Sequence, residues 1–542
     1  MSTKNTTKPR LFDSIFDVVL KHPFIFTALL CLLLFPMGFA NAENVTTPSV
    51  IFEMIVWLGI LSALFVVGKP SGNSKVNIYL AISSAVIIIV FSLLVSENKS
   101  NSMLMSVPAA AIVIQLAVVL FHEEKLDADK IVILMIVMGV VLRYCYCLKY
   151  SSAEMQHDQG TFDGSAGHLS YISYWYKNGL KLPDFDVSDT PNYIHWQYYH
   201  PPLHHILMAC GMKVLSFFGM TDEWAREAVQ ILPMIYSALS MVACYRIFKL
   251  VKLGGAGLVS AMAIPCFYRT FIIWSGAYNN DMLCAMFMLL SMMLTLKWYY
   301  KPTLLNILPI AVCVGCGMMA KLSGWMVAPA IALVFLWKFI QNIKKPLPFI
   351  GQYAAFGAVS VPLGLWWGIR NYLEFGTPIT YVPDLKSASM SVEQIPVAQR
   401  LFDFSFFQFD YPFMAFKGHG APYNEFNPAF GLFKTSLFDE YHKPEGTHGV
   451  EMMLVVMAAL LALLGIIGLI YMLVKKNNGI DLPVKAFFAV VFLTIIISYY
   501  LFCFQFPYVC TENIRYCIPV IPILAMGLGF LVNAAGKALK KQ

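Results

Sequence analysis

Apolar runs of membrane-spanning length recur along almost the whole chain. A helix needs about 20 consecutive apolar residues to cross the hydrocarbon core of a bilayer. Of the 542 residues, 58% are hydrophobic and 13% are charged, whereas soluble proteins average about 25% charged residues. A soluble fold cannot bury so much apolar surface, so lipid must solvate most of this chain. The sequence therefore predicts an all-α polytopic membrane protein.

About 14 transmembrane helices are predicted, and one further run is ambiguous. The predicted spans lie near residues 22–40, 50–68, 77–95, 103–121, 130–148, 229–250, 254–275, 280–300, 303–320, 322–341, 350–373, 450–474, 484–506 and 515–535. The ambiguous run, 202–219, contains His204, His205 and Lys213. Such polar residues fit a helix at the membrane interface better than one buried in lipid.

The distribution of basic residues sets the predicted orientation. Short cytoplasmic loops collect Lys and Arg. If 202–219 does not cross, the basic clusters all fall on one side, while the short opposite loops 41–49 and 276–279 contain no Lys or Arg. We therefore expect an interfacial or re-entrant helix at 202–219, both termini in the cytoplasm, and a multi-pass protein of the plasma membrane.

The charge and the cysteines indicate neither a nucleic-acid partner nor a disulfide framework. The net charge of +7 comes from short clusters between apolar runs, which is a topology signal, so nucleic acid is not an expected partner. Most of the twelve cysteines lie inside apolar runs. They fit small hydrophobic residues of helices rather than a disulfide framework.

Two long segments, which we call the first long loop (149–228) and the second long loop (374–449), are predicted on the outer side. The first is rich in Asp, His, Tyr and Trp, and the second contains the aromatic stretch FDFSFFQFDYPFMAF at 402–416. Loops of this length on a helical scaffold are usually functional. We expect interfacial helices in them, and packing of the aromatic stretch on the bilayer or on the other loop.

Acidic residues open the first long loop directly after a predicted span. The stretch SSAEMQHDQGTFDG contains Glu154, His157, Asp158 and Asp163. A carboxylate at the boundary between lipid and water can meet a lipid-borne substrate from one side and a soluble one from the other. Burial and a nearby cation can adjust its pKa for general-base work. An ordinary solvated loop acid is the alternative for any single residue.

Cations stand at the outer ends of four predicted spans: Arg269, Lys321, Arg370 and Arg515. Ionisable residues at membrane depth are costly and usually have a partner. Cations at one depth can neutralise a phosphate or pyrophosphate anchored in that leaflet. Pairing with a loop acid and contact with lipid headgroups are the alternatives.

Two further stretches carry polar residues at the outer side. YYHPPLHH contains His200 four residues before His204, a spacing compatible with zinc, but Pro201 and Pro202 place His200 ahead of the helix start. An interfacial helix with His200 facing a polar cavity fits better, with His204 and His205 meeting headgroups. Asn280 and Asp281 in WSGAYNNDML fit either a helix cap or polar contacts to a substrate.

The order of these motifs resembles a known family. The acid after a span, then HPPL, NND, KLSG, RNYLEFG and RY with its following prolines resemble the GT-C fold glycosyltransferases that use lipid phosphosugars. The pattern looks closest to glycosyltransferase family 39, the dolichyl-phosphate-mannose protein mannosyltransferase-like group and its bacterial relatives. The resemblance covers about residues 130–535, so the expected domains are an extra N-terminal four-helix membrane bundle, 1–128, and a GT-C-like catalytic domain, 129–542.

The resemblance implies a function and roles for residues. It implies an inverting transfer of a sugar from a polyprenyl-phosphate donor to a hydroxyl on a protein, lipid or glycan, with Asp158 as the base. His157, Asp163, His200, Asn280 and Asp281 are then expected to bind substrate. The expected donor-phosphate ligands are Lys321, Arg370, Arg515 and Arg269. No cofactor is expected, although a divalent metal is not excluded.

Two other functions remain open at the level of sequence. A transporter or flippase of lipid-linked sugars could use the same cations, but it would place paired charges near the bilayer midplane and broken helices in both halves. A binding scaffold could recruit a partner through the second long loop and would place no demand on Asp158.

Overall fold

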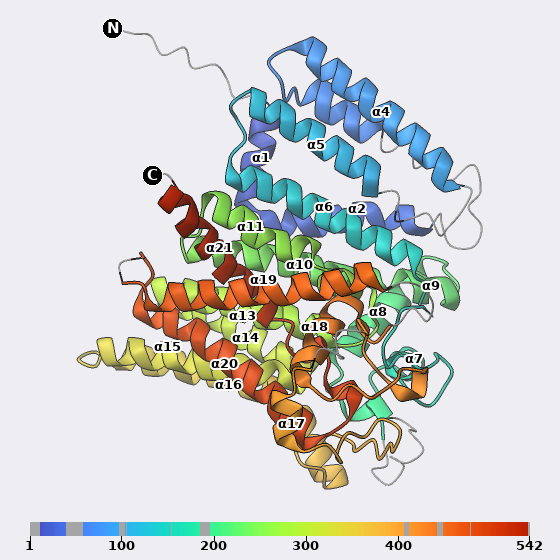
Figure 1. Cartoon of the computed structure of the whole chain (residues 1–542), viewed down its shortest axis with the longest axis vertical. Helices are drawn as coiled ribbons and strands as arrows, with labels where there is room; N and C mark the ends of the chain where they lie inside the picture. The colour runs from blue at the N-terminus through green and yellow to red at the C-terminus, as the bar shows by residue number, and fades with distance from the viewer. Residues whose placement is uncertain are drawn as a thin grey trace. The chain divides into compact units, whose positions relative to one another are not determined.

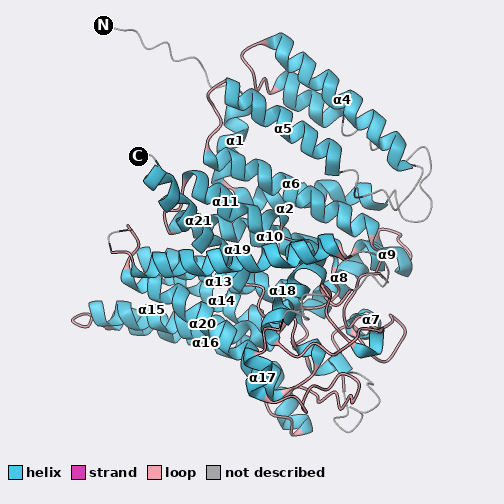
Figure 2. Cartoon of the chain, viewed as in Figure 1, coloured by secondary structure: helices cyan, strands magenta, loops and turns pink. Residues whose placement is uncertain are grey.

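The computed structural model describes residues 11–39, 58–96, 103, 106–152, 154–184, 196–405, 411–441, 448–476 and 478–539. Over these residues the secondary structure is helical, with one isolated bridge between Ser391 and Tyr508 and no named strand, as Figure 2 shows. The predicted all-α class is confirmed. The residues at both ends of the chain lie outside the described part, and the cytoplasmic placement of the termini remains a prediction.

The chain divides into two compact units, Met1–Ser151 and Ser152–Gln542. The elements of the first unit are α1 (Leu11–Lys21), α2 (Pro23–Phe39), the π-helical η1 (Ala63–Val67), α4 (Ser74–Ser96), α5 (Ser106–His122) and α6 (Ala128–Lys149). The expected division into an added bundle, 1–128, and a catalytic domain, 129–542, concerns function and stays a prediction.

The second unit contains the remaining elements, from teal to red in Figure 1. Its first half comprises α7 (His168–Asn178), η4 (Trp196–Tyr199), α8 (Leu203–Phe217), α9 (Asp222–Ala228), α10 (Ile231–Leu250), α11 (Gly255–Phe267), α12 (Arg269–Ile273), η5 (Trp274–Gly276) and α13 (Asp281–Tyr300). Its second half comprises α14 (Leu304–Ala320), η6 (Leu322–Val327), α15 (Ala328–Gln341), α16 (Leu347–Phe375), α17 (Val397–Phe402), η8 (Lys417–His419), α18 (Pro428–Phe438), α19 (Gly449–Val474), α20 (Leu482–Gln505), η9 (Val509–Thr511), η10 (Ile514–Tyr516) and α21 (Val520–Leu539).

Eight described helices are long and apolar enough to cross a membrane, or up to ten if each sharply bent pair counts as one span. The bent pairs are α1 with the start of α2, at 106°, and α11 with the segment Arg269–Gly276, at 44°. Several predicted spans correspond to shorter helices such as α5 and α14, and part of the predicted span 50–68 lies outside the described residues. The protein is an integral membrane protein, and the count of 14 spans stays a prediction.

Glycines allow two helices of the second unit to pack with their backbones close together. Helix α19 packs along α21. A Cβ added at Gly468 would lie 2.0 Å from the Gly527 carbonyl oxygen, and one at Gly527 would lie 2.2 Å from the Gly465 carbonyl oxygen. Close approach through small residues is the usual way for helices to associate in lipid, where apolar surface alone supplies little attraction between them.

Helix α8 occupies the ambiguous run and has the two faces that an interfacial helix requires. It follows Pro201 and Pro202, and its His204, His205 and Met208 are buried. The helix packs against α7, α9 and α14, while Phe217 and the following Phe218 are exposed. The expectation that His204 and His205 meet headgroups is wrong, because both side chains are buried in the protein.

A buried ion pair joins the second long loop to the segment between α20 and α21, and a second buried pair lies within the loop itself. Arg400 of α17 contacts Glu512 at 3.2 Å, and Lys434 of α18 contacts Glu425 at 2.5 Å. All four of these side chains have exposed fractions of 2% or less. Within the aromatic stretch, residues 406–410 lie outside the described part, and the Phe413 ring packs 5.0 Å from the Phe438 ring of α18.

Candidate active site

A cavity of about 490 Å³ lies in the second unit, where the loops meet the ends of several long helices. Asp158, His200, Asp281, Lys321 and Arg515 line it. An apolar side of the same cavity is formed by residues of η6, α16 and α20 that include Leu322, Trp325, Gly364, Gly368 and Leu501. The cavity therefore combines a cluster of charges with a wall that suits an apolar chain.

The backbone around Asp158 is fixed by the start of α7. The amide N–H groups of His168 and Leu169 donate to the carbonyls of Asp158 and Gln159, each at 2.9 Å. Gly167 has φ +92°, and a Cβ there would lie 2.1 Å from the Gln159 carbonyl oxygen. Asp158 itself has φ +52°, a left-handed conformation that non-glycine residues rarely adopt and that Asp tolerates better than most. The loop thus holds Asp158 in one position.

Arg515 and His157 flank the carboxylate of Asp158. Nη1 of Arg515 donates to Oδ2 at 2.8 Å, and Nε2 of His157 lies 3.3 Å from the same oxygen. Burial disfavours ionisation of Asp158, but the charges of His157 and Arg515 outweigh burial and hold the pKa of its carboxyl well below the usual range. Both contacts use Oδ2, so Oδ1 can receive a proton from a group in the cavity.

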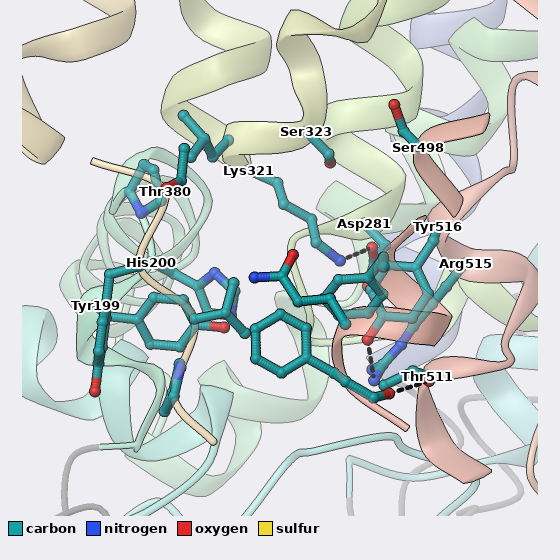
Figure 3. A pocket seen from close by; sticks show the side chains of 18 of the residues that line it. Tyr199, His200, Asp281, Lys321, Ser323, Thr380, Ser498, Thr511, Arg515 and Tyr516 are labelled. Carbon is teal, nitrogen blue, oxygen red and sulfur yellow. Dashed lines mark hydrogen bonds and ion pairs between the residues drawn. The ribbon is translucent and has the colours of Figure 1, made fainter. Parts of the chain in front are cut away.

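Lys321 forms the second charged pair of the cavity, as Figure 3 shows. Its Nζ lies 2.5 Å from Oδ1 of Asp281, the first residue of α13. The same ammonium lies 4.6 Å from the centroid of the Tyr516 ring, and the Tyr516 hydroxyl accepts from Nη2 of Arg515 at 3.0 Å. Tyr516 therefore bridges the two cavity cations, Lys321 and Arg515.

Histidines form another wall of the cavity. His168 stacks on His200 with ring centroids 5.6 Å apart and on His205 with centroids 5.2 Å apart. Nδ1 of His168 and Nε2 of His205 share a hydrogen bond of 2.9 Å. Burial lowers the pKa of His168, His200 and His205, so these rings are neutral hydrogen-bonding groups at neutral pH.

Two of the four predicted donor-phosphate ligands lie away from the cavity. Nη2 of Arg370 contacts Glu374 at 2.5 Å and donates to the Pro183 carbonyl at 2.8 Å, and Arg370 is not among the cavity-lining residues. The guanidinium of Arg269 lies 5.0 Å from the Phe438 ring of α18 and is also outside the lining. Both arginines join helices to loop segments, whereas Lys321 and Arg515 face the cavity.

Three predicted substrate-binding residues also lie outside the cavity lining. Asp163 pairs with Lys177 on the surface, where its side chain is 80% exposed. Nδ2 of Asn280 donates to the Ala320 carbonyl at 2.8 Å and so joins the start of α13 to the end of α14. His157 is buried behind Asp158. His200 and Asp281 do line the cavity.

The structure adds four residues that were not predicted as site residues. Asp439 and Glu440 follow α18 and approach His157, with Oε2 of Glu440 3.3 Å from Nδ1 of the imidazole. His168 and Tyr516 line the cavity. Tyr516 belongs to the RY motif quoted above, and the sequence carries no comparable signal for the other three residues.

Within the described part of the chain, no group of three or more His, Cys, Asp or Glu side chains has an arrangement that could hold a metal ion. His200, the residue considered for zinc, is instead a wall of the cavity, stacked on His168.

The comparison with protein families agrees with the motif pattern. Residues 199–367 match the family model of dolichyl-phosphate-mannose-protein mannosyltransferase. This segment begins at the HPPL motif, includes NND and KLSG, and contributes His200, Asp281 and Lys321 to the cavity. Over this segment the chain is similar to membrane glycosyltransferases, which confirms the resemblance for these motifs.

Solved structures show similarity at a low level. The crystal structure of ArnT from Cupriavidus metallidurans in the apo state has 12% identity, covers 74% of this chain and 77% of that chain, and gives a TM-score of 0.34. The structure of the same protein bound to undecaprenyl phosphate has 13% identity, covers 74% and 78%, and gives a TM-score of 0.33. No curated protein matches the sequence.

Proposed function

We propose that the protein is an inverting glycosyltransferase that moves a sugar from a polyprenyl-phosphate donor to a hydroxyl acceptor. One observation carries this proposal: Asp158, Lys321 and Arg515 line a single cavity that also has an apolar wall. A general base, an anion site and a surface for an isoprenoid chain are the three requirements of such a transfer. The match of residues 199–367 to the mannosyltransferase family model supports the same reaction class.

The donor phosphate binds between Lys321 and Arg515. Both cations face the cavity. Tyr516 contacts both of them, Lys321 through its ring and Arg515 through its hydroxyl. Arg515 offers the planar donor set that fits two phosphate oxygens, and Lys321 adds a point charge. The apolar residues of η6 and α20, such as Leu322 and Leu501, then face the first isoprene units.

The reaction is a single displacement at the anomeric carbon. Oδ1 of Asp158 takes the proton of the acceptor hydroxyl while the hydroxyl oxygen forms a bond to that carbon. The bond between the carbon and the phosphate oxygen breaks on the opposite face, its electron pair stays on the phosphate, and the configuration inverts. Positioned proton transfer contributes about 10²- to 10⁴-fold. Lys321 and Arg515 stabilise the charge that develops on the phosphate, so the step requires no metal.

Donor binding and base strength are coupled through Arg515. Without a donor, the Arg515 guanidinium bonds Asp158 and contributes to the low pKa of that carboxyl, which makes it a weak base. A phosphate that shares Arg515 reduces this effect, so the pKa of Asp158 rises toward the range that suits proton abstraction. The base is then strongest when the sugar donor is in place.

The acceptor is a hydroxyl of a protein, lipid or glycan on the extracytoplasmic side of the plasma membrane. The long loops line the cavity together with helix ends, through residues such as His168 and Tyr381. This position lets an acceptor from water meet a donor that remains in the leaflet. The distribution of basic residues along the sequence supports the outer placement of these loops.

Transfer by the purified protein tests the proposal. The full chain, reconstituted in proteoliposomes, is incubated with a panel of polyprenyl-phosphate hexoses and pentoses and with membrane lipid and glycan acceptors. The expected result is a covalent glycan product and stoichiometric polyprenyl phosphate, both detected by mass spectrometry and absent with Asp158→Asn. Movement of the intact lipid-linked sugar across the vesicle without any covalent product would overturn the proposal.

A further inference from the structure

His157 is the meeting point of three chain segments that are distant in sequence. It belongs to the first long loop, and its side chain is 8% exposed. Nε2 lies 3.3 Å from Oδ2 of Asp158, and Nδ1 lies 3.3 Å from Oε2 of Glu440, at the end of the second long loop. The edge of the imidazole faces Trp274 of η5. The ring is therefore held between two carboxylates, one on each nitrogen.

The Glu440 carboxylate is itself held in place by Asn513. Nδ2 of Asn513 donates to Oε1 of Glu440 at 3.2 Å and to Oδ1 of Asp439 at 2.7 Å. Oδ1 of Asn513 accepts from the backbone N–H of Arg515 at 2.9 Å, and Asn513 is fully buried. Glu440 is thus connected to both partners of the Asp158–Arg515 pair, to Asp158 through His157 and to Arg515 through Asn513.

We propose that Glu440 is a positioning residue for the base of the sugar transfer, acting on Asp158 through His157. This inference rests on the proposed function. Glu440 holds the imidazole through the 3.3 Å contact between its Oε2 and Nδ1 of the ring. Nε2 of the same ring lies 3.3 Å from Oδ2 of Asp158. The carboxylate is then anchored at Oδ2 by His157 and Arg515, and Oδ1 is kept toward the acceptor hydroxyl.

The chemistry of the two nitrogens explains why an acid is required at position 440. A carboxylate at position 440 favours a hydrogen on Nδ1 of the ring that faces it, because a charged acceptor forms the stronger contact with a donor. A neutral partner at position 440 removes that preference and leaves the ring free to rotate or to turn an acceptor nitrogen toward Asp158. A displacement of about 1 Å at a catalytic group costs on the order of 100-fold in rate. The second long loop therefore helps to position the catalytic base, through Glu440, in addition to lining the cavity.

The test compares Glu440→Gln with Glu393→Gln in the reconstituted full chain. Glu393 lies in the same loop with an exposed side chain and serves as the matched control. We expect Glu440→Gln to lower kcat about 10- to 100-fold, with the KM for the donor and the binding of undecaprenyl phosphate, followed by native mass spectrometry, unchanged. We expect Glu440→Asp to retain an intermediate kcat and Glu393→Gln to match the wild type.

A double-variant cycle separates action through His157 from an independent effect. If Glu440 acts through the imidazole, Glu440→Gln combined with His157→Gln lowers kcat no further than His157→Gln alone. Multiplying losses in the double variant would overturn the inference, as would wild-type kcat in Glu440→Gln. If Glu440→Gln fails to fold, His157→Gln decides the question, because wild-type kcat in that variant would leave Glu440 no residue to act through and would overturn the inference. Absence of transfer by the wild type would overturn the proposed function as well, whereas an unchanged Glu440→Gln beside an inactive Asp158→Asn would overturn this inference alone.

Discussion

Nη1 of Arg515 donates a 2.8 Å hydrogen bond to Oδ2 of Asp158 across 357 positions of the chain. Through this bond the segment after α20 is attached to the loop that precedes α7. Lys321 and Asp281 form a second pair beside it. Each cation of the cavity is thus held by an acid until an anionic ligand shares it, and the predictions below follow from these two pairs and from the packing around them.

Asp158→Asn should abolish transfer and leave the protein folded. Asparagine tolerates the left-handed backbone of position 158 and has nearly the same shape, but it cannot take the acceptor proton. We expect kcat to fall about 10²- to 10⁴-fold. Thermal unfolding in detergent should remain cooperative but begin at a lower temperature than in the wild type, because the change leaves Arg515, 7% exposed, without its acid. Near-normal turnover in this variant would reject Asp158 as the base.

Lys321→Met should reduce both stability and donor binding, and a second substitution should separate the two effects. The single change leaves Asp281, whose side chain is 3% exposed, without its cation, and removing one partner of a buried pair costs about 3–5 kcal/mol. Adding Asp281→Asn should restore the midpoint of unfolding but not the affinity for undecaprenyl phosphate. Recovery of that affinity in the double variant would show that Lys321 does not bind phosphate.

Acid should destabilise the protein through its buried histidines. Burial lowers the pKa of His204 from 6.5 to about 4, opposed by its hydrogen bond to the Tyr278 carbonyl. Below pH 6.5 the unfolded chain binds a proton at this residue and the folded chain does not, so the free energy of unfolding falls as the pH falls from 6.5 to 4. The shift corresponds to roughly 3 kcal/mol. His168, His200 and His205 add effects of the same sign.

His204→Gln isolates this contribution, because Gln can still donate to the Tyr278 carbonyl. The melting temperature of the variant should fall less between pH 7 and pH 5 than that of the wild type. Parallel pH dependence in the two proteins would contradict the assignment of this proton linkage to His204.

Gly468→Val should disrupt the packing of α19 on α21. The added Cβ would lie 2.0 Å from the Gly527 carbonyl oxygen, so the helices must separate and the backbone contact is lost. We expect a clearly lower melting temperature in detergent. Gly351→Ala in α16 is the matched control, since nothing lies within 4 Å of a Cβ there, and it should be neutral or stabilising by up to about 1 kcal/mol. Equal effects of the two changes would argue against this contact.

The part of the site that could be predicted is the part with a local signal. Asp158, Lys321 and Arg515 are conspicuous in the sequence because a charged residue at the end of an apolar run is energetically unfavourable unless it has a partner or binds a ligand. The same rule also selects Arg370, which bonds Glu374 one helical turn later, and Arg269, which lies beside Phe438. A charged side chain at membrane depth has the same energetic cost whether it lines the cavity or pairs elsewhere. Position along the chain therefore does not reveal which cations face the cavity.

The missing part depends on contacts between distant segments. Glu440 reaches His157 only because the second long loop folds back across the first, and Asn513 then joins both to Arg515. His157, Glu440 and Asn513 lie outside helices, so no period of 2 or 3.6 places them on a known face. The helices were predictable for the opposite reason, since each requires only a continuous apolar run.

A structure of the protein bound to undecaprenyl phosphate tests the central arrangement most directly. The phosphate should lie between Nζ of Lys321 and the guanidinium of Arg515, within hydrogen-bonding distance of both, with the isoprenoid chain against Leu322 and Leu501 and with Oδ1 of Asp158 free to meet an acceptor. Density for the phosphate beside Arg370 or Arg269 instead, with the Lys321–Asp281 and Arg515–Asp158 pairs undisturbed, would contradict it.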